Sequence, residues 1–238
     1  MDPPKLSTSQ PIMSLDDIGI QYIDNGILEK GKFYRGGDKT SLGQNFTKKY
    51  QELFEEIRDQ PNHVLELGVL DGRSIAMWSD YFKNGHIVGV DINLSRYNKN
   101  KNNLEKLGAF TNNNYTVLEL NIKEESFMEY INGLNYQFHI IIDDALHQPK
   151  QQFVNFVNLF SSLASGGIYI VEDLVKPSSV VEFFKDIIIG VSSSKPMTIN
   201  SSKKKKKNLE EKPVNLSQII RQIESIEFRK NMIVIKKQ

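Results

Sequence analysis

Acidic side chains and one histidine follow two apolar runs of the chain. The run Phe138–Asp143 ends in an aspartate, and Asp144 and His147 come soon after it. The run Gly167–Glu172 ends in a glutamate, and Asp173 follows directly. If the two runs are neighbouring strands, their ends lie roughly 5 Å apart, and these side chains converge at one edge of a sheet.

The three carboxylates of Asp144, Glu172 and Asp173 would repel one another at such an edge unless a cation neutralised them. Oxygen ligands of this kind suit Mg²⁺ or another divalent cation. A single acid at the end of a strand is ordinarily a helix cap or a solvated loop residue. Four such residues at two strand ends, with His147 among them, favour an active site, and we predict a metal bound by the three acids.

A hydroxyl group beside a divalent cation holds its proton less tightly, because the cation stabilises the developing alkoxide. Histidine accepts protons near neutral pH, so His147 is the predicted general base. Asp144, which would position the cation, is the second predicted catalytic residue. The chemistry that fits is the attack of an activated hydroxyl on an electrophilic carbon.

A glycine-containing loop lies between the earlier run His63–Leu67 and a helical pattern. Gly68 and Gly72 allow the backbone to turn tightly and to approach a ligand where a Cβ atom would clash. Glu66 lies near the end of the run. Asp91 closes the next run, at about the separation at which Rossmann-like folds place a carboxylate for the two ribose hydroxyls. The pattern therefore predicts an adenosine-containing ligand.

The loop reads Gly-Val-Leu-Asp-Gly, which departs from the G-x-G-x-x-G pattern of dinucleotide-binding folds. Its bulkier middle and the acidic Glu66 disfavour a pyrophosphate and suit a cofactor with an amino group and a sulfonium. S-adenosylmethionine is such a cofactor, and its methyl carbon is an electrophile that an aligned hydroxyl oxygen can attack. The predicted cofactor-binding residues are Glu66, Gly68, Gly72, Ser74, Asp91, Asn121 and Asp143.

Short β-branched runs alternate with helical patterns along the chain, which is typical of parallel βαβ units. Several runs are apolar almost throughout, as in central strands that helices cover on both faces. We therefore predict an α/β, Rossmann-like doubly wound sheet. The expected strands are His63–Leu67, His86–Asp91, Tyr115–Leu120, Phe138–Asp143 and Gly167–Glu172. The expected crossover helices are Arg73–Phe82, Tyr97–Leu107, Glu124–Ile131, Lys150–Leu163 and Ser178–Ile188.

The flanks of this alternation carry less regular patterns. Thr47–Arg58 places apolar residues on one face, which predicts an extra helix on the sheet. Ser225–Phe228 and Met232–Lys236 are expected to form a terminal antiparallel hairpin. Residues 191–213, rich in serine and lysine, are expected to be a mobile insertion, because they cannot bury enough apolar surface to order themselves.

The composition is that of one globular domain. At 238 residues the chain is long enough for one substantial core and short for two enzymatic domains. We expect that domain over residues 33–238, after a flexible lead-in over 1–32. The absence of cysteine excludes disulfides, thiolate metal ligands and a cysteine nucleophile. The net charge of +1 disfavours a nucleic-acid partner. No signal-like or membrane-spanning segment stands out, so we expect a cytoplasmic protein, and a homo-oligomer is compatible with this sequence.

These motifs resemble the macrocin and mycinamicin O-methyltransferases, which are metal-dependent enzymes that methylate sugar hydroxyls. The resemblance rests on ELGVLDGRS, DDALH, IYIVEDL and GGDKTS, and it runs from Phe33 to Leu174 with a weaker echo in FRKNMIVIKK. It implies a seven-stranded class I methyltransferase fold and the use of S-adenosylmethionine.

The resemblance also implies roles for single residues. Asp144 matches a metal ligand of the family and His147 matches its catalytic base. Glu172 and Asp173 match further metal ligands. The stretch Gly36–Lys39 matches one that helps to order the region over the active site.

This chain departs from the family pattern at three places. Ala145 and Leu146 stand where relatives tend to carry Gly-Ser, which makes the rim of the pocket bulkier and more apolar. Gln44 and Phe46 replace a histidine and tyrosine pattern near the expected substrate contacts, and the lysine-rich insertion has no counterpart. We therefore expect a small-molecule acceptor that is a sugar in a setting other than a macrolide, such as a nucleotide sugar or a glycan.

Two other functions stay open. A catechol or another aromatic diol would chelate the same ion through adjacent hydroxyls, and aromatic side chains converging from the N-terminal segment would favour it. A non-catalytic Rossmann-like module, kept for oligomerisation or nucleic-acid binding, would act through Lys203–Lys207 instead. The acids and the histidine of the predicted site argue against the second alternative.

Overall fold

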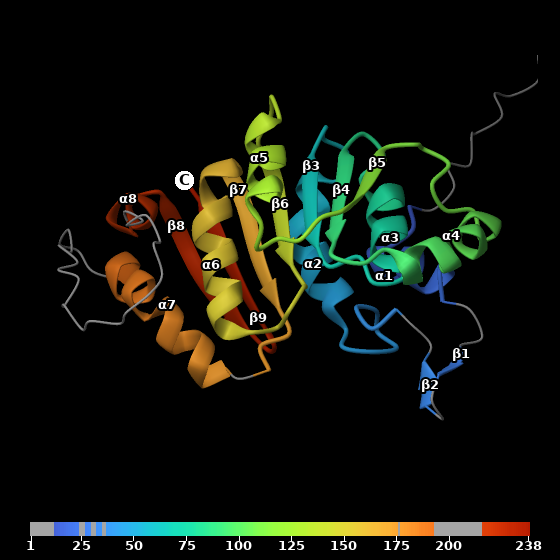
Figure 1. The fold of residues 1–238 in the computed structure, drawn as a ribbon, viewed down its shortest axis with the longest axis horizontal. Coiled ribbons are helices and arrows are strands. Elements are labelled where there is room, and N and C mark those ends of the chain that lie inside the picture. The colour runs from blue at the N-terminus through green and yellow to red at the C-terminus, as the bar shows by residue number, and fades with distance from the viewer. Residues whose placement is uncertain (1–11, 24–26, 30–31, 35–36, 176, 193–215) are drawn as a thin grey trace, which may run out of the picture.

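Seven strands form one mixed sheet with helices packed against both of its faces (Figure 1). The computed structural model describes residues 12–23, 27–29, 32–34, 37–175, 177–192 and 216–238. In order across the sheet, the strands are β5 (Tyr115–Glu119), β4 (His86–Asp91), β3 (His63–Leu67), β6 (Phe138–Asp143), β7 (Leu163–Glu172), β9 (Met232–Lys237) and β8 (Ile223–Arg229). The strands from β5 to β7 pair in parallel, and β9 and β8 continue the sheet in antiparallel pairing. The predicted doubly wound sheet and terminal hairpin are thereby confirmed.

Alternating side chains of the central strands fill two cores. On β3, Val64 packs with the first group of helices, whereas Leu65 and Leu67 pack with the second group. Both faces are therefore covered, which explains the almost continuous apolar runs in the sequence. The first group is α1 (Leu15–Gln21), α2 (Phe46–Phe54), α3 (Arg73–Tyr81) and α4 (Ser95–Lys106). The second group is α5 (Glu125–Gly133), α6 (Pro149–Leu159), α7 (Pro177–Ser192) and α8 (Leu216–Arg221).

The predicted strands are observed with small changes at their ends. The bounds of β3, β4 and β6 are those predicted, while β7 begins earlier, at Leu163. The pairing of β6 with β7 shifts register between Phe138 and Ile140, and this irregularity accommodates the longer strand. The predicted extra helix is α2 followed by a short 3₁₀ turn, Glu55–Ile57.

The N-terminal segment differs from its prediction. A flexible lead-in is expected over residues 1–32, yet α1 lies within this range and packs against α2 and α3. The side chain of Ser14 caps the helix, and Leu15 and Ile18 are buried. Burial of this apolar face explains why the segment is ordered. Strands β1 (Ile27–Glu29) and β2 (Lys32–Tyr34) form a separate two-stranded ladder, and residues 1–11, 24–26 and 30–31 lie outside the described residues.

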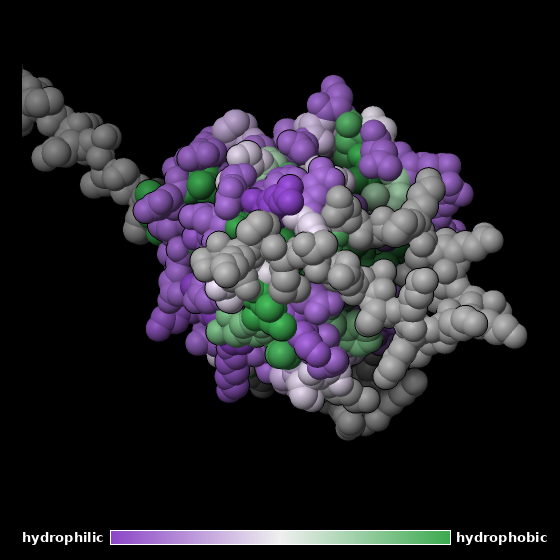
Figure 2. All heavy atoms as spheres, turned by 90° about the vertical axis from the view of Figure 1, so that its left-hand side faces the viewer, coloured by the Kyte–Doolittle hydropathy of each residue, from purple (hydrophilic) through white to green (hydrophobic). Residues whose placement is uncertain are grey.

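The insertion expected over 191–213 lies outside the described residues, except for the last two residues of α7. Helix α7 exposes Val181, Phe183 and Ile189 to solvent. Figure 2 views the side of the molecule on which α7 and α8 lie, and it shows hydrophobic side chains surrounded by hydrophilic ones. In the part of the chain that the structure describes, no helix is both long and apolar enough to cross a membrane.

Candidate active site

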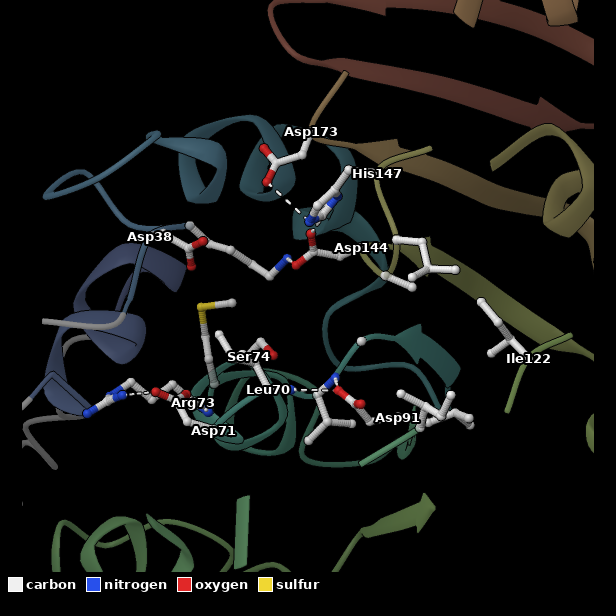
Figure 3. A pocket seen from close by; sticks show the side chains of 18 of the residues that line it. Asp38, Leu70, Asp71, Arg73, Ser74, Asp91, Ile122, Asp144, His147 and Asp173 are labelled. Carbon is white, nitrogen blue, oxygen red and sulfur yellow. Dashed lines mark hydrogen bonds and ion pairs between the residues drawn. The ribbon is translucent and has the colours of Figure 1, made fainter. Parts of the chain in front are cut away.

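A cavity of about 450 Å³ lies at the carboxyl ends of the parallel strands. Its walls come from the loops that follow β3, β4, β5, β6 and β7, together with residues 37–40 and parts of α1 and α3 (Figure 3). This is the edge at which open α/β sheets bind ligands, and the volume suits a small organic molecule. The cavity is therefore the candidate active site.

The predicted site residues divide into two sets by position. Those that line the cavity are Gly68, Ser74, Asp91, Asn121, Asp144, His147 and Asp173. Those that lie outside its lining are Glu66, Gly72, Asp143 and Glu172. The strand ends thus come together as the sequence analysis requires, because β6 and β7 are neighbours in the sheet.

The loop after β3 is fixed by Asp91 at the end of β4. Its Oδ2 atom accepts hydrogen bonds from the backbone N–H groups of Val69 and Leu70, at 2.9 and 3.0 Å. Gly68 has a φ of +94°, and a Cβ atom there would collide with the carbonyl oxygen of Asp144. Two strand ends therefore meet across this glycine. Gly72 has a φ of +86°, a Cβ atom there would collide with the ring of Tyr97, and the residue is outside the cavity lining.

Asn121, also predicted to bind the cofactor, lines the cavity and is bonded to its own loop. Its side-chain amide donates to Glu124 at 2.9 Å, and its Oδ1 accepts from the backbone N–H of Lys123 at 3.1 Å. These bonds hold the loop after β5 beside the cavity, so the immediate role of Asn121 is to shape this wall.

His147 lies between two carboxylates at the cavity wall (Figure 3). Its Nδ1 atom is 3.9 Å from Oδ1 of Asp144, and its Nε2 atom is 3.9 Å from Oδ2 of Asp173. The Nδ1 atom is buried and makes no hydrogen bond within the described protein. His147, Asp173 and Leu70 all have positive φ angles, of 47°, 51° and 51°, although none is glycine. Strained backbone of this kind concentrates at functional sites.

The same three side chains could hold a metal ion. One ligand atom from each of Asp144, His147 and Asp173 lies within 4.8 Å of the other two. Carboxylate oxygens with one imidazole nitrogen suit a divalent cation, and the unpartnered Nδ1 atom of His147 is a free donor atom for it. The residues present therefore fit a divalent cation. Glu172, the other predicted ligand, is outside this group.

Glu172 instead forms hydrogen bonds with Lys39, which lines the cavity. Nζ of Lys39 donates to both carboxylate oxygens of Glu172, at 2.6 and 2.7 Å, and to Oδ2 of Asp144 at 2.6 Å. The hydroxyl of Tyr50 also donates to Glu172. Glu66 lies 3.5 Å from the same Nζ atom. An acid cluster from three strand ends thus surrounds one ammonium group.

Glu66 is buried beside α3 and does not reach the cavity. Its carboxylate accepts hydrogen bonds from the hydroxyl of Ser74 at 2.7 Å and from Nε1 of Trp78 at 3.3 Å. Glu66 and Glu172 lie on the α2–α3 side of the sheet, because they alternate in step with the residues of their strands that face that core. Their predicted contacts with cofactor and metal stay predictions.

Burial and charge act in opposite directions on this cluster. Burial raises the pKa values of Glu66, Asp144 and Glu172, and the nearby ammonium of Lys39 opposes that rise. Burial alone would lower the pKa of Lys39, but Asp144, Glu172 and Glu66 together raise it well above its ordinary value. Lys39 is therefore charged. The net pKa values of the three acids stay raised in spite of Lys39, so a further positive charge beside them would favour their ionised forms.

Asp143, also predicted to bind the cofactor, lies outside the cavity lining, and its contact with the cofactor stays a prediction. It points to the α6 side of the sheet, where Nδ2 of Asn155 donates to its Oδ2 atom at 2.9 Å. The hydroxyl of Tyr169 lies 3.5 Å from the same oxygen. Burial raises the pKa of Asp143 to about 7. Adjacent Asp143 and Asp144 thus lie on opposite sides of the sheet, only the second at the cavity.

Several cavity residues were not predicted. The apolar side chains of Leu70, Ile92 and Ile122 line the wall around Asp91, and Ile92 is 63% exposed. In the sequence these residues look like ordinary loop residues. An apolar residue directly after an acid at the end of a strand, as Ile92 is after Asp91, could nevertheless have indicated a cavity wall. Gly19 also lines the cavity, and it belongs to α1, a helix that was not predicted from the sequence. Lys39 was noted only within a family motif, because nothing local predicts partners 105 and 133 residues away.

The chain is similar in sequence to curated O-methyltransferases. No family model matches the chain. A curated 8-demethyl-8-(2-methoxy-alpha-L-rhamnosyl)-tetracenomycin-C 3'-O-methyltransferase from Streptomyces olivaceus is 33% identical over 144 residues, which are 58% of this chain and 34% of that protein. The mycinamicin VI 2''-O-methyltransferase of Micromonospora griseorubida is 29% identical over 136 residues, 54% of this chain and 31% of that protein. The chain thus spans about a third of the length of the curated relatives it matches.

A solved structure decides the fold. The MycE methyltransferase from the mycinamycin biosynthetic pathway, in complex with Mg, SAH and mycinamycin VI, aligns with a TM-score of 0.64 at 20% sequence identity. The alignment covers 94% of this chain and 54% of that chain. The protein has the class I methyltransferase fold. The resemblance inferred from the motifs is confirmed as well, since the curated relatives are sugar O-methyltransferases. In this methyltransferase fold, the cavity and its acids occupy the ligand-binding edge of the sheet.

Proposed function

We propose that the protein is an S-adenosylmethionine-dependent and Mg²⁺-dependent O-methyltransferase that acts on a hydroxyl of a sugar or a sugar-containing small molecule. The observation that carries the proposal is the position of His147 between Asp144 and Asp173. This group lines the same cavity as Gly68 and Asp91. A base, a cation site and a loop suited to adenosine therefore open into one space.

The cofactor would lie along the walls formed by the loops after β3, β4 and β5. Asp91 has carboxylate lone pairs for the ribose hydroxyls in addition to those that accept from the loop backbone. Leu70, Ile92 and Ile122 provide apolar surface for the adenine ring. S-adenosylmethionine supplies the methyl group when it is bound.

The chain's own residues would then handle the acceptor's proton. Because Nδ1 of His147 is buried, we assign proton acceptance to Nε2. The carboxylates of Asp144 and Asp173, each 3.9 Å from one ring nitrogen, would stabilise the resulting imidazolium. A divalent cation held by these acids lowers the proton affinity of a neighbouring hydroxyl. The protein's remaining contribution is alignment of the two reactants.

The lining favours a sugar over a catechol as the acceptor. Within the part of the chain that the structure describes, no Phe, Tyr or Trp lines the cavity. A flat aromatic acceptor would therefore lack aromatic stacking partners among these residues, whereas polar lining side chains such as Asp38 and Asp173 could bond the hydroxyls of a sugar. Leu146 at the wall is 41% exposed and offers an apolar contact to whatever carries the sugar. The names of the curated relatives likewise refer to glycosylated small molecules. The proposed acceptors are thus sugars, including nucleotide sugars.

Titration calorimetry with S-adenosylmethionine, in the presence and absence of Mg²⁺, is the first test. We expect cofactor binding in the micromolar range, roughly 8 kcal/mol of binding free energy. Its absence in both conditions would favour the non-catalytic module. A panel of nucleotide sugars, glycosylated small molecules and catechols, read by mass spectrometry for a gain of one methyl group, then identifies the acceptor. Methylation of catechols alone would replace the sugar by the aromatic alternative.

A further inference from the structure

Lys39 is the centre of the buried acid cluster. Its Nζ atom lies 2.6 Å from Oδ2 of Asp144, 2.6 Å from Oε2 of Glu172 and 3.5 Å from Oε1 of Glu66. These acids come from three strand ends, and the lysine is 5% exposed. A buried ammonium in this position compensates the negative charge of the acids, as a bound metal cation would.

The same contacts occupy ligand atoms that a metal would need. Both oxygens of Glu172 accept from Lys39, and Oε1 also accepts from the hydroxyl of Tyr50. Oδ2 of Asp144 accepts from Lys39 as well, which leaves only its Oδ1 atom on the side of His147. While Lys39 stays in place, the predicted acid ligands thus offer Oδ1 of Asp144 and Oδ2 of Asp173, because Oδ1 of Asp173 accepts from Nε2 of Gln44 at 2.8 Å.

This arrangement also sets a conflict for His147. With Lys39 in place, the residues that can gather around an ion are Asp144, His147 and Asp173. A neutral imidazole has one nitrogen with a lone pair and one N–H group, so if Nδ1 binds the ion, Nε2 carries the hydrogen and cannot accept a proton. Departure of Lys39 would free Glu172, and the ion could then take three carboxylates and leave His147 as the base.

We propose that Lys39 is an internal cation that holds the place of the metal between Asp144 and Glu172 and is displaced when a divalent ion binds. This inference rests on the proposed function, since it concerns the same cation site. Lys39 borders the cavity, so its side chain has space to move into. In the absence of the ion its single positive charge reduces the repulsion among Glu66, Asp144 and Glu172, and this helps to keep the strand ends together. Lys39 is therefore a positioning residue that sets both the affinity for the ion and the stability of the ion-free protein.

Chemical labelling of the wild-type protein tests the displacement directly. Lysines are acetylated with a trace of isotope-labelled acetic anhydride while MgCl₂ or MnCl₂ is titrated, and each site is quantified by mass spectrometry. Acetylation of Lys39 is expected to rise with ion concentration, because its ammonium leaves the buried cluster. Lys48, which is exposed on α2, serves as the internal reference and should not change. Unchanged protection of Lys39 at a concentration at which calorimetry shows the site saturated would overturn the proposal.

Substitution gives an independent measurement. In Lys39→Met the ion no longer competes with an ammonium, so Mn²⁺ should bind at least about ten-fold more tightly by calorimetry or by electron paramagnetic resonance. The ion-free variant should melt at a lower temperature than wild type and regain the difference on addition of Mn²⁺. Lys48→Met is the matched control, and Lys39→Gln, which keeps a hydrogen-bond donor, replaces the first variant if that one does not fold.

The outcomes separate this inference from the function on which it rests. Equal or weaker Mn²⁺ binding by the Lys39 variants, with normal binding by wild type, overturns the displacement alone. Absence of Mn²⁺ binding in every protein overturns the metal-dependent function and the displacement with it. Binding of S-adenosylmethionine, measured in parallel, reports on the cofactor site independently of either result.

Discussion

Nδ2 of Asn155 donates a hydrogen bond of 2.9 Å to Oδ2 of Asp143, and both side chains are buried on the α6 side of the sheet. Burial raises the pKa of Asp143 to about 7 from an ordinary 3.8, although the bond from Asn155 favours the carboxylate. Between these two values the folded protein holds a proton that the unfolded chain has released. The contribution of Asp143 to stability is therefore full below pH 3.8 and is lost as the pH rises through 7.

Asp143→Asn should remove this pH dependence, because an amide carries no charge at any of these pH values. The free energy of unfolding of the variant, minus that of wild type, is expected to increase between pH 4 and pH 8 by up to about 4 kcal/mol. Urea unfolding at several pH values measures it, and the subtraction cancels the other titrating groups. Asp186→Asn, an exposed change on α7, should give a flat difference. If this difference in the free energy of unfolding did not change with pH for Asp143→Asn, burial would not raise the pKa of Asp143.

His147→Ala should abolish most turnover and leave cofactor binding nearly unchanged. The imidazole lies between Asp144 and Asp173 and has no hydrogen bond that holds the cofactor loop. Loss of a general base costs about 10²–10⁴-fold in rate. Initial rates with saturating S-adenosylmethionine measure the first effect, and calorimetry measures the second.

His147→Asn controls for the backbone of the same residue. His147 has a φ of 47°, a conformation that asparagine adopts more readily than alanine does. If only the alanine variant loses activity, the loss comes from a relaxed loop and not from a missing base. If both variants stay active, the base must be sought at another residue.

The fold could be predicted from the sequence wherever the residue types of a segment reveal whether that segment is buried. Strands covered on both faces must be apolar at every position, so the bounds of β3 and β6 could be read directly. Helix α1 escaped prediction because a seven-residue helix whose buried aliphatic side chains are Leu15 and Ile18 is too short a pattern to separate from a loop. Its order depends on α2 and α3, which no local pattern reveals.

The sequence predicted which strand ends form the candidate site, but it did not predict the direction in which each side chain points. Strand ends converge by topology, which placed Asp91, Asp144 and Asp173 at the cavity. Whether an acid faces the cavity or a core depends on one step of alternation, and Asp143 falls on the other side of the sheet. The lysine that bridges the acids arrives from a separate loop. The role of Lys39 could therefore be recognised only from its contacts in the folded structure.

Asp91→Asn should weaken the binding of S-adenosylmethionine by at least about ten-fold, since a carboxylate accepts from two hydroxyls and an amide oxygen cannot replace both of its oxygens. Calorimetry measures the affinity. The matched control is Glu119→Gln at the end of the adjacent strand β5, where the carboxylate accepts from the backbone of Leu94 and does not line the cavity. Equal losses in the two variants would indicate a general loosening of the sheet edge, and no loss in Asp91→Asn would place the ribose elsewhere.

Gly68→Ala should destabilise the protein by at least about 2 kcal/mol, because the new Cβ atom would meet the carbonyl oxygen of Asp144 and a φ of +94° is unfavourable for alanine. The loop after β6 must then move, so the affinity for the cofactor and the metal should fall as well. Gly133→Ala is the opposite case, since a Cβ atom on this last residue of α5 meets no atom within 4 Å and alanine restricts the unfolded chain, which stabilises the fold by about 0.4–1 kcal/mol. Urea unfolding of the two variants should therefore shift in opposite directions. A Gly68→Ala protein as stable as wild type would mean that the two strand ends are held apart in solution, and the shared site of Asp91 and Asp144 would then lose its support.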